Sequence, residues 1–342
     1  MHVAVIGVGA VGGALAAALD RAGVQVTAVV RPTSSSAAAI RSHGLRLDGA
    51  RGTHTAHPTV AEQLPTNCDL VVVAVRSFQL ESALTPHAER LTPGGDLAHV
   101  PVVVAQNGLL GPDTAARLIG RNHGVLGALA LYAATGHGDG RVTLTGGGAV
   151  RVGALHPGDF ALAAEVAAVI APAFAASPVR DLRGALWSKL LVNHVNALPA
   201  VTGRSVQWCC RQPSTARIVA ASLTETVTVA DRAGVRFAPL GLIGPATVAQ
   251  IRSGDAATLV RSRLASAFGV RPNPASTLQS IRRGEPTEID ALNGAVVMTA
   301  ASLRCSAPVN RMLVGLVHEV ERRGRFYSLA RLREVARYQG VL

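Results

Sequence analysis

Two patterns of apolar positions alternate along the first half of the chain. Short apolar runs predict β-strands, and Ala-rich stretches with helical spacing lie between them. The segment DLVVVAV at 69–75 is a near-continuous β-branched run, as expected for a strand that is buried on both faces of a parallel sheet. Strands separated by helices predict a doubly wound α/β sheet. The predicted strands are His2–Ile6, Gln25–Val30, Asp69–Val75 and Pro101–Ala105, and the first predicted helix is Ala10–Ala22.

From about Gly124 the pattern changes to apolar runs punctuated by glycine. These runs predict antiparallel strands that close the edge of the sheet. An Ala-rich helix over Ala161–Ala176 follows, with Pro172 inside it. The predicted closing strands are Val125–Tyr132, Arg141–Thr145 and Val150–Gly153.

After about residue 180 the strand signal fades and long helical periodicity takes over. We therefore expect two domains: an α/β domain over residues 1–180 and an all-α domain over residues 181–342. GVRPNP at 269–274 predicts a turn-rich loop, and the tail at 328–342 is amphipathic and rich in Arg. The predicted helices are Gly184–Leu198, Thr215–Ala233, Ala246–Ser253, Ala256–Ala267, Glu288–Leu303 and Pro308–Arg323.

Composition narrows the class of protein. With 342 residues, 49% of them hydrophobic and 16% charged, the chain is globular and long enough for two cores. The net charge of +12 is scattered along the sequence, and aromatic residues make up only 3%. This combination argues against nucleic-acid binding, which uses basic patches and stacking platforms, and favours an anionic small ligand.

Cysteine and histidine usage gives no sign of a metal site. The four cysteines form no CxxC pair, and the eleven histidines are dispersed. We expect reduced thiols, no bound metal and no disulfides. The N-terminus lacks a basic segment before its apolar stretch, and no apolar run reaches the roughly 18 residues of a membrane span. The sequence therefore predicts a soluble, cytoplasmic protein without a membrane partner.

A glycine-rich motif follows the first predicted strand. Gly7-Val8-Gly9-Ala10-Val11-Gly12 is a GxGxxG sequence that directly opens a predicted helix. In this setting the first glycine permits a tight turn, the second lets the backbone approach a pyrophosphate, and the third allows close packing of helix on strand. The helix N-terminus offers free N–H groups and a partial positive charge to the phosphates. The motif predicts a dinucleotide-binding turn.

The end of the second predicted strand indicates which dinucleotide is bound. NAD-binding versions usually carry Asp or Glu there for the ribose hydroxyls. This chain has Arg31 instead, placed to pair with a 2′-phosphate, and Thr33 and Ser34 could add hydroxyl donors. The pattern favours NADP (NADPH), although in an Arg-rich chain Arg31 is also compatible with an ordinary surface role.

Two further groups follow strands that we expect to be parallel. Arg76 ends one of them, and Gln106-Asn107-Gly108 follows the next. Ligands bind at the carboxyl ends of strands in such sheets. The Asn107 amide can bond both a nicotinamide-side group and a substrate oxygen; read without a ligand, the segment is simply a turn.

Lys189 is the only lysine among 33 basic residues. Arg cannot release a proton near neutral pH, whereas burial and neighbouring cations lower the pKa of Lys enough for proton transfer. A single retained Lys therefore marks a position where Arg fails chemically, unless the residue survived by chance on a solvated face. Lys189 and Asn193 are four residues apart and share one helical face.

The order of these motifs along nearly the whole chain resembles the ketopantoate reductase (2-dehydropantoate 2-reductase) family. The resemblance rests on GxGxxG, the Arg after the second strand, the strand-end Val-Arg, QNG and W-x-K-L-x-x-N. It continues with Ser276-Thr277-Leu278-Gln279, Thr287-Glu288-Ile289-Asp290 and Asn293-Gly294. It implies a Rossmann-type N-terminal domain that binds NADP and an all-helical substrate domain. It also implies reduction of 2-dehydropantoate to (R)-pantoate, as in pantothenate biosynthesis.

The resemblance also implies roles for individual residues. Lys189 matches the proton donor and Glu288 the carboxylate that works with it. Asn193, Asn196, Ser276 and Asn107 match substrate-binding residues, and the glycine-rich turn, Arg31, Arg76, Gln106 and Asn107 match the cofactor site. Two of these have structural alternatives, because Glu288 could serve only the N-terminus of its helix and Ser276 could be an N-cap.

The chain departs from the family pattern at two positions. Arg76 stands where the family usually has Lys, and Ala197 stands where it carries a second Asn, with Asn196 one place earlier. These departures affect the expected substrate more than the expected reaction. A reductase of another 2-oxo acid or of an imine, and a non-catalytic NADP-binding regulator, therefore stay open as alternatives. A homodimer also stays open.

Overall fold

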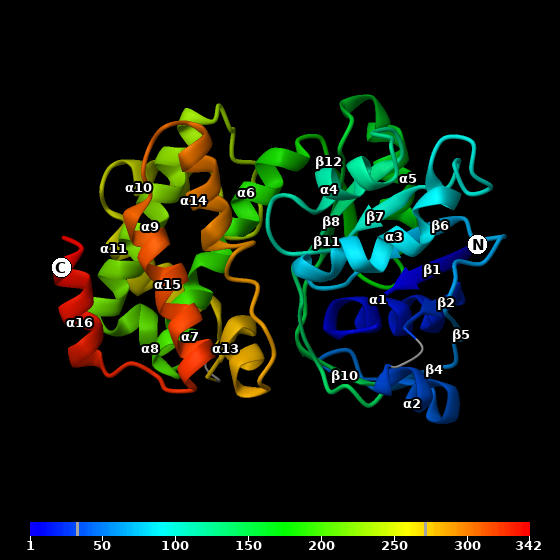
Figure 1. The fold of residues 1–342 in the computed structure, drawn as a ribbon, viewed down its shortest axis with the longest axis horizontal. Helices are drawn as coiled ribbons and strands as arrows, with labels where there is room; N and C mark the ends of the chain where they lie inside the picture. The colour runs from blue at the N-terminus through cyan, green and yellow to red at the C-terminus, as the bar shows by residue number, and fades with distance from the viewer. Residues whose placement is uncertain (32–33, 270–271) are drawn as a thin grey trace. The chain divides into compact units, whose positions relative to one another are not determined.

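The computed structural model describes residues 1–31, 34–269 and 272–342. The chain divides into two compact units, Met1–Leu182 and Arg183–Leu342. The first is built from a sheet with helices and the second almost wholly from helices (Figure 1). Thr33, predicted as a hydroxyl donor, lies outside the described residues, as do positions 270 and 271 of the predicted turn-rich loop.

An eight-stranded sheet forms the centre of the first unit, in the order β12-β11-β8-β7-β6-β1-β2-β5. β1 pairs in parallel with β2 on one side and with β6 on the other. The chain order therefore reverses beside β1, where open α/β sheets bind ligands. The strands are β1 His2–Ile6, β2 Gln25–Val29, β5 Thr59–Ala61, β6 Leu70–Val73, β7 Val102–Val104, β8 Val125–Ala130, β11 Val150–Ala154 and β12 Ala176–Val179.

Apolar side chains cover both faces of this sheet. Along β1, Val3 and Val5 join the core formed with α1 and α5, whereas Ala4 and Ile6 join the core formed with α3 and α4. This alternation follows the two-residue period of a strand and confirms the predicted doubly wound α/β fold. The helices are α1 Ala10–Arg21, α2 Ser35–His43, α3 Leu80–Leu91, α4 Gly111–Leu118 and α5 Phe160–Ile170.

A second, four-stranded sheet packs against α1. Its order is β4-β3-β10-β9, and β10 pairs in parallel with β3. The hydroxyl of Tyr132 donates a hydrogen bond to the Val11 carbonyl oxygen at 3.0 Å, which ties the chain before β9 to the first turn of α1. The strands are β3 Leu45–Gly49, β4 His54–Ala56, β9 Ala133–Gly136 and β10 Arg141–Gly146.

The predicted closing strands are confirmed in part. β11 pairs antiparallel with β8 as predicted, but β8 itself is parallel to β7, and β10 belongs to the second sheet. The helix predicted over Ala161–Ala176 ends at Ile170, since Pro172 cannot continue it. The residues from Ala176 form β12, an edge strand that tolerates Pro178.

The second unit buries one large apolar core among its helices. The predicted helices near 215–233, 246–253 and 308–323 are confirmed, whereas that over 184–198 breaks after Asn193 and that over 256–267 contains a π-helical segment, Val260–Leu264. The helices are α6 Leu182–Asn193, α7 Ala197–Thr202, α8 Val206–Arg211, α9 Pro213–Arg232, α10 Pro245–Arg252, α11 Ala256–Leu259, α12 Ala265–Ala267, α13 Ala275–Arg282, α14 Asn293–Ser302, α15 Pro308–Arg323 and α16 Leu329–Tyr338.

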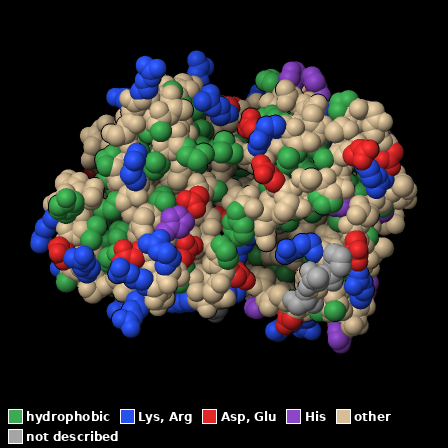
Figure 2. Space-filling model, viewed as in Figure 1, with side chains coloured by type: hydrophobic (Ala, Val, Ile, Leu, Met, Phe, Trp, Pro, Cys, Tyr) green, Lys and Arg blue, Asp and Glu red, His purple; other side chains and the backbone are tan. Residues whose placement is uncertain are grey.

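Surface charge is dispersed on the face shown in Figure 2. Basic side chains stand at many separate places, with acidic side chains between them. This distribution matches the scattered charge of the sequence. In the described part of the chain, no helix has the length and apolar character needed to cross a membrane.

Candidate active site

The predicted cofactor residues of the first unit lie at one edge of the main sheet. The neighbouring strands β7, β6, β1 and β2 are mutually parallel, so their carboxyl ends meet at this edge. The QNG segment follows β7, Arg76 follows β6, the glycine-rich turn follows β1 and Arg31 follows β2. The fold therefore brings four separate sequence segments together in that order.

The glycine-rich turn needs glycine for steric reasons that can be read from its geometry. Gly7 has a φ of +91°, a conformation that side chains disfavour. A Cβ at position 12 would lie 2.0 Å from the Gly7 carbonyl oxygen and 2.8 Å from the Ala74 Cβ. At Gly9, by contrast, an added Cβ would have no described atom within 4 Å. Gly9 thus faces open space at the start of α1, where a ligand backbone can approach.

Arg31 is exposed just beyond the end of β2. The nearest carboxylate downstream, Asp48, forms an ion pair with Arg46 at 2.9 Å. Ser34, the N-cap position of α2, shares a hydrogen bond with the Ser36 hydroxyl at 2.7 Å. The end of β2 therefore presents a guanidinium and the start of a helix, which suits an anionic group.

Gln106 links the ends of β7 and β6. Its Nε2 donates to the carbonyl oxygens of Val75, at 2.8 Å, and Arg76, at 3.2 Å. Its Oε1 is buried without a hydrogen-bond partner among the described residues. This unmatched acceptor at the carboxyl edge fits a site that is completed by a ligand. Asn107, next in the chain, is half-buried.

Lys189 lies on α6 between strongly buried neighbours. Trp187, Ser188 and Leu190 are at most 3% exposed, and the Ser188 hydroxyl donates to the Ala238 carbonyl oxygen at 2.6 Å. These contacts fix the rotation of α6, and Lys189 itself is half-buried among these neighbours. Burial lowers the pKa of the Lys189 ammonium to about 8. A lysine with this pKa can donate a proton near neutral pH.

The helix tightens immediately after Asn193. Residues His194–Asn196 form a 3₁₀ turn before α7 begins at Ala197. Side chains three residues apart eclipse each other in such a turn, whereas an α-helix aligns residues four apart. Asn196 therefore takes the face that a regular helix would give to Ala197.

Ser276 lies opposite this turn. The Asn196 Nδ2 is 3.5 Å from the Ser276 Oγ, at the limit of hydrogen bonding. Ser276 is an exposed residue in the first turn of α13, so its alternative role as an N-cap is wrong. Ala275 before it has a φ of +62°, and its N–H donates to Asn273 Oδ1 at 2.8 Å. This strained conformation, rare for alanine, orients the start of α13.

Glu288 is not at a helix start, contrary to the prediction. α14 begins only at Asn293, and residues 288–292 form consecutive turns in which the Leu292 N–H donates to the Glu288 carbonyl oxygen at 3.1 Å. Glu288 is half-buried, whereas the next residue, Ile289, is fully buried and anchors the turn in the core. The alternative role, a carboxylate that stabilises the N-terminus of its own helix, therefore does not apply.

A buried polar network joins the segments of Lys189 and Glu288. The Asn293 Nδ2 lies 2.9 Å from His194 Nδ1, and the His194 Nε2 lies 2.9 Å from the Thr226 hydroxyl on α9. Burial lowers the pKa of His194 to about 3, so the ring is neutral. His194 follows Lys189 by five positions, and Asn293 follows Glu288 by five positions. Sequence analysis missed His194, since nothing local distinguishes it.

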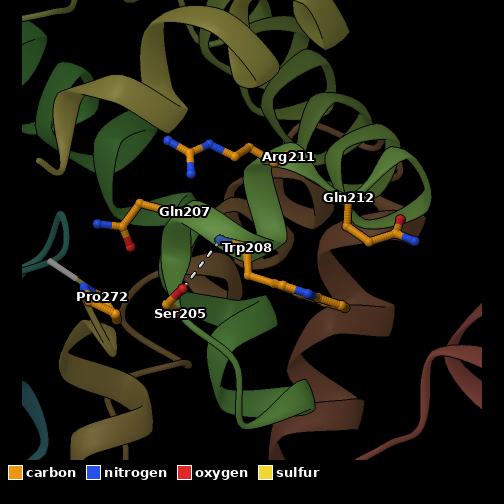
Figure 3. A pocket seen from close by; sticks show the side chains of 6 residues that line it. All are labelled: Ser205, Gln207, Trp208, Arg211, Gln212 and Pro272. Carbon is orange, nitrogen blue, oxygen red and sulfur yellow. Dashed lines mark hydrogen bonds between the residues drawn. The ribbon is translucent and has the colours of Figure 1, made fainter. Parts of the chain in front are cut away.

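A surface cavity of about 400 Å³ lies elsewhere in the second unit (Figure 3). In the figure the side chains of Gln207 and Arg211 extend to one side of α8 and the Trp208 ring to the other. The Gln207 amide is already bonded to the loop before α13, since it donates to Phe268 O and accepts from Asn273 N–H. The cavity contains none of the predicted site residues. Its lining residues are Ser205, Gln207, Trp208, Arg211, Gln212 and Pro272.

Three possible metal ligands meet in the first unit, although the sequence predicted no metal site. His123, His156 and Asp159 each place one ligand atom within 4.8 Å of the others. Protein contacts already account for this cluster: Asp159 accepts from Gly124 N–H at 2.7 Å and faces His123 Nδ1 at 3.1 Å. His156 Nδ1 accepts from Gly158 N–H at 3.2 Å. The cluster therefore joins the chain at 123–124 to the chain at 156–159 by hydrogen bonds.

Comparison with known proteins agrees with the division into an α/β unit and a helical unit. The first unit has a Rossmann-type fold and the second is helical. Residues 3–157 match the family described as "Ketopantoate reductase PanE/ApbA", and residues 181–321 match "Ketopantoate reductase PanE/ApbA C terminal". The chain belongs to the ketopantoate reductase family, as the motifs predicted.

Relatives cover nearly the whole chain. It is 30% identical over 333 residues to a 2-dehydropantoate 2-reductase of Halobacterium salinarum, covering 95% of this chain and 100% of that protein. The crystal structure of a PanE/ApbA family ketopantoate reductase from Ralstonia eutropha JMP134 is similar, with a TM-score of 0.76 and 29% identity over 94% of this chain and 99% of that one. D-mandelate dehydrogenase, solved with NADH and anilino(oxo)acetate, shares the fold, with a TM-score of 0.80 at 20% identity, covering 94% and 98%.

Proposed function

We propose that this protein reduces 2-dehydropantoate to (R)-pantoate with NADPH. The observation that carries the proposal is Lys189, whose ammonium has a pKa lowered to about 8 on α6, the helix that ends at Asn193 and is followed by the 3₁₀ turn with Asn196. The proposal assigns the dinucleotide to the α/β unit and the proton donor to the helical unit. It rests also on the family to which the chain belongs.

The residues of the helical unit suit the charge that develops during ketone reduction. A bound nicotinamide dinucleotide would supply the hydride. The Lys189 Nζ stabilises the developing alkoxide oxygen by its charge and then gives it a proton. Glu288 supports the ammonium form of Lys189, and Asn193, Asn196 and Ser276 bind polar atoms of the substrate. Asn107, in the α/β unit, matches a further substrate-binding residue of the family pattern.

The α/β unit fits a dinucleotide on three observations. The backbone at Gly9 has open space beside it, the Gln106 Oε1 is a buried acceptor without a partner among the described residues, and the Arg31 guanidinium is exposed just after β2. The Gly7–Gly12 turn would hold the pyrophosphate, and Arg31 the 2′-phosphate. Arg76 and Gln106 would complete the cofactor site.

The test is NADPH oxidation by the purified protein with 2-dehydropantoate beside pyruvate, 2-oxobutyrate and phenylglyoxylate. We expect 2-dehydropantoate to give the highest kcat/KM. Asn196 stands one position earlier than the asparagine of the family pattern. A preference for another oxo acid would therefore change the proposed substrate and leave the proposed type of reaction in place. Tight NADPH binding without turnover on any oxo acid or imine would instead indicate a regulator and contradict the proposal.

Replacing Arg31 by alanine should change cofactor preference. A charge-assisted bond to a phosphate contributes about 1.5–3 kcal/mol, so we expect the KM for NADPH to rise about 10- to 100-fold, with little change in the KM for NADH. Arg41→Ala, an exposed arginine on the adjacent α2, is the matched control and should leave both values unchanged. Equal losses for NADPH and NADH in Arg31→Ala would contradict the 2′-phosphate role.

A further inference from the structure

The turn that carries Glu288 is tied to α15 on both sides of that residue. Before it, the Thr287 N–H donates to Glu321 Oε1 at 2.8 Å. After it, the Asp290 Oδ1 lies 3.0 Å from His318 Nε2. His318 and Glu321 both belong to α15, and their side chains also meet, with His318 Nδ1 2.7 Å from Glu321 Oε2. Figure 2 shows histidine and acidic side chains gathered over α15.

These contacts form one continuous relay: Thr287 N–H, the Glu321 carboxylate, the His318 ring and the Asp290 carboxylate. Both ring nitrogens face carboxylate oxygens, which only accept hydrogen bonds. A neutral imidazole donates from one nitrogen, so it satisfies one carboxylate and repels the other. The imidazolium donates from both nitrogens. The complete relay therefore requires protonated His318.

We propose that His318 is a positioning residue that, when protonated, holds the Thr287–Asp290 turn so that the Glu288 carboxylate is presented to support Lys189. The inference rests on the proposed function, because it gives Glu288 its role there. His318 itself is a third exposed and bonds to the turn through Asp290 and Glu321. It therefore acts through the turn.

The charges around His318 fit this role. The groups that act on it are Asp290 from the turn and Glu321 from its own helix. Burial alone would lower the pKa of His318, but hydrogen bonds and charge from these two carboxylates outweigh it and raise the pKa above its usual value. Since the folded pKa is raised, the imidazolium is present at low pH, and the relay weakens as pH rises through that raised pKa.

Two substitutions at position 318 distinguish the effect of the positive charge from that of side-chain shape. His318→Gln stays neutral at every pH and cannot donate to both carboxylates with charge, whereas His318→Arg keeps a permanent charge and several donors. We expect His318→Gln to lower kcat for oxo-acid reduction about tenfold without changing the KM for NADPH. His318→Arg should recover most of this loss, and neither variant should retain the His318 step in the kcat–pH profile. His54→Gln removes a comparable half-buried His–carboxylate pair, His54–Asp20, and should match the wild type.

Hydrogen exchange of the segment 287–292 gives a readout that does not depend on turnover. At one fixed pH below the raised pKa, we expect faster exchange there in His318→Gln than in the wild type and near-normal exchange in His318→Arg. An unchanged hydrogen-exchange rate of segment 287–292 in His318→Gln would show that His318 does not hold the turn. Faster exchange of this segment in His318→Gln, with kcat within twofold of the wild type, would show that the turn held by His318 does not matter for the role of Glu288. A wild-type protein without turnover would instead refute the proposed function, while exchange would still test the tie.

Discussion

We expect Lys189→Arg to lower kcat for oxo-acid reduction by about 10²- to 10⁴-fold while leaving NADPH affinity and folding intact. Arginine keeps the positive charge, so electrostatic stabilisation of the alkoxide is retained in part. It has no proton to release near neutral pH, because its pKa is above about 12. The size of the loss therefore measures the proton-transfer part of the reaction, separately from the charge.

The pH profile distinguishes the two contributions of Lys189. Its pKa is lowered to about 8, so the protonated acid needed for reduction is present below that pH and lost above it. In the wild type, kcat/KM for reduction should fall about tenfold per pH unit above about pH 8. Oxidation of the 2-hydroxy acid needs the neutral amine and should rise to a plateau above the same pH. Both limbs should disappear in Lys189→Arg.

The matched control makes the opposite substitution, arginine to lysine, at another position on the same helix. Arg183 is exposed on α6 and donates to the Ala233 carbonyl oxygen at 3.1 Å, a contact that lysine can also make. Arg183→Lys should retain kcat within about twofold of the wild type. If Lys189→Arg also kept turnover and the wild-type pH profile, Lys189 would not be the proton donor, and the retained lysine would be an accident of composition.

The sequence predicted those features that depend on local patterns. The buried runs near β1, β6 and β7 and the GxGxxG turn are defined by neighbouring residues, and the structure has them where they were expected. Strands β4 and β5 contain only three residues each and exist because of their pairing partners. The four-residue strand β12 likewise depends on β11. Local propensity has no signal for elements of this kind.

Parts of the site were beyond prediction for the same reason. The 3₁₀ turn that realigns Asn196 follows a helix whose sequence pattern continues without interruption to Leu198. The ties from His318 to Asp290 and from Glu321 to Thr287 join residues 28 and 34 positions apart. The motif TEID indicated Glu288 but gave no sign of what holds its turn. Such contacts follow from how α14 and α15 pack, which the sequence pattern of either helix alone does not specify.

Gly12→Ala should disrupt the glycine-rich turn itself. The new Cβ would lie 2.0 Å from the Gly7 carbonyl oxygen, which is backbone and cannot move without displacing the turn between β1 and α1. We expect a loss of about 3 kcal/mol or more in the free energy of unfolding of the α/β unit. We also expect the Kd for NADPH to rise at least about 100-fold, measured by fluorescence titration alongside chemical denaturation.

Gly9→Ala is the informative partner of this variant, because the two glycines differ in what surrounds them. The Cβ at position 9 would meet no described atom within 4 Å, so folding stability should stay at the wild-type value. If the pyrophosphate approaches the backbone here, the same methyl group should still raise the Kd for NADPH about tenfold or more. A stable Gly9→Ala protein with wild-type NADPH affinity would place the dinucleotide elsewhere. Weak binding without loss of stability would separate the ligand's need for glycine at position 9 from the fold's need for it at position 12.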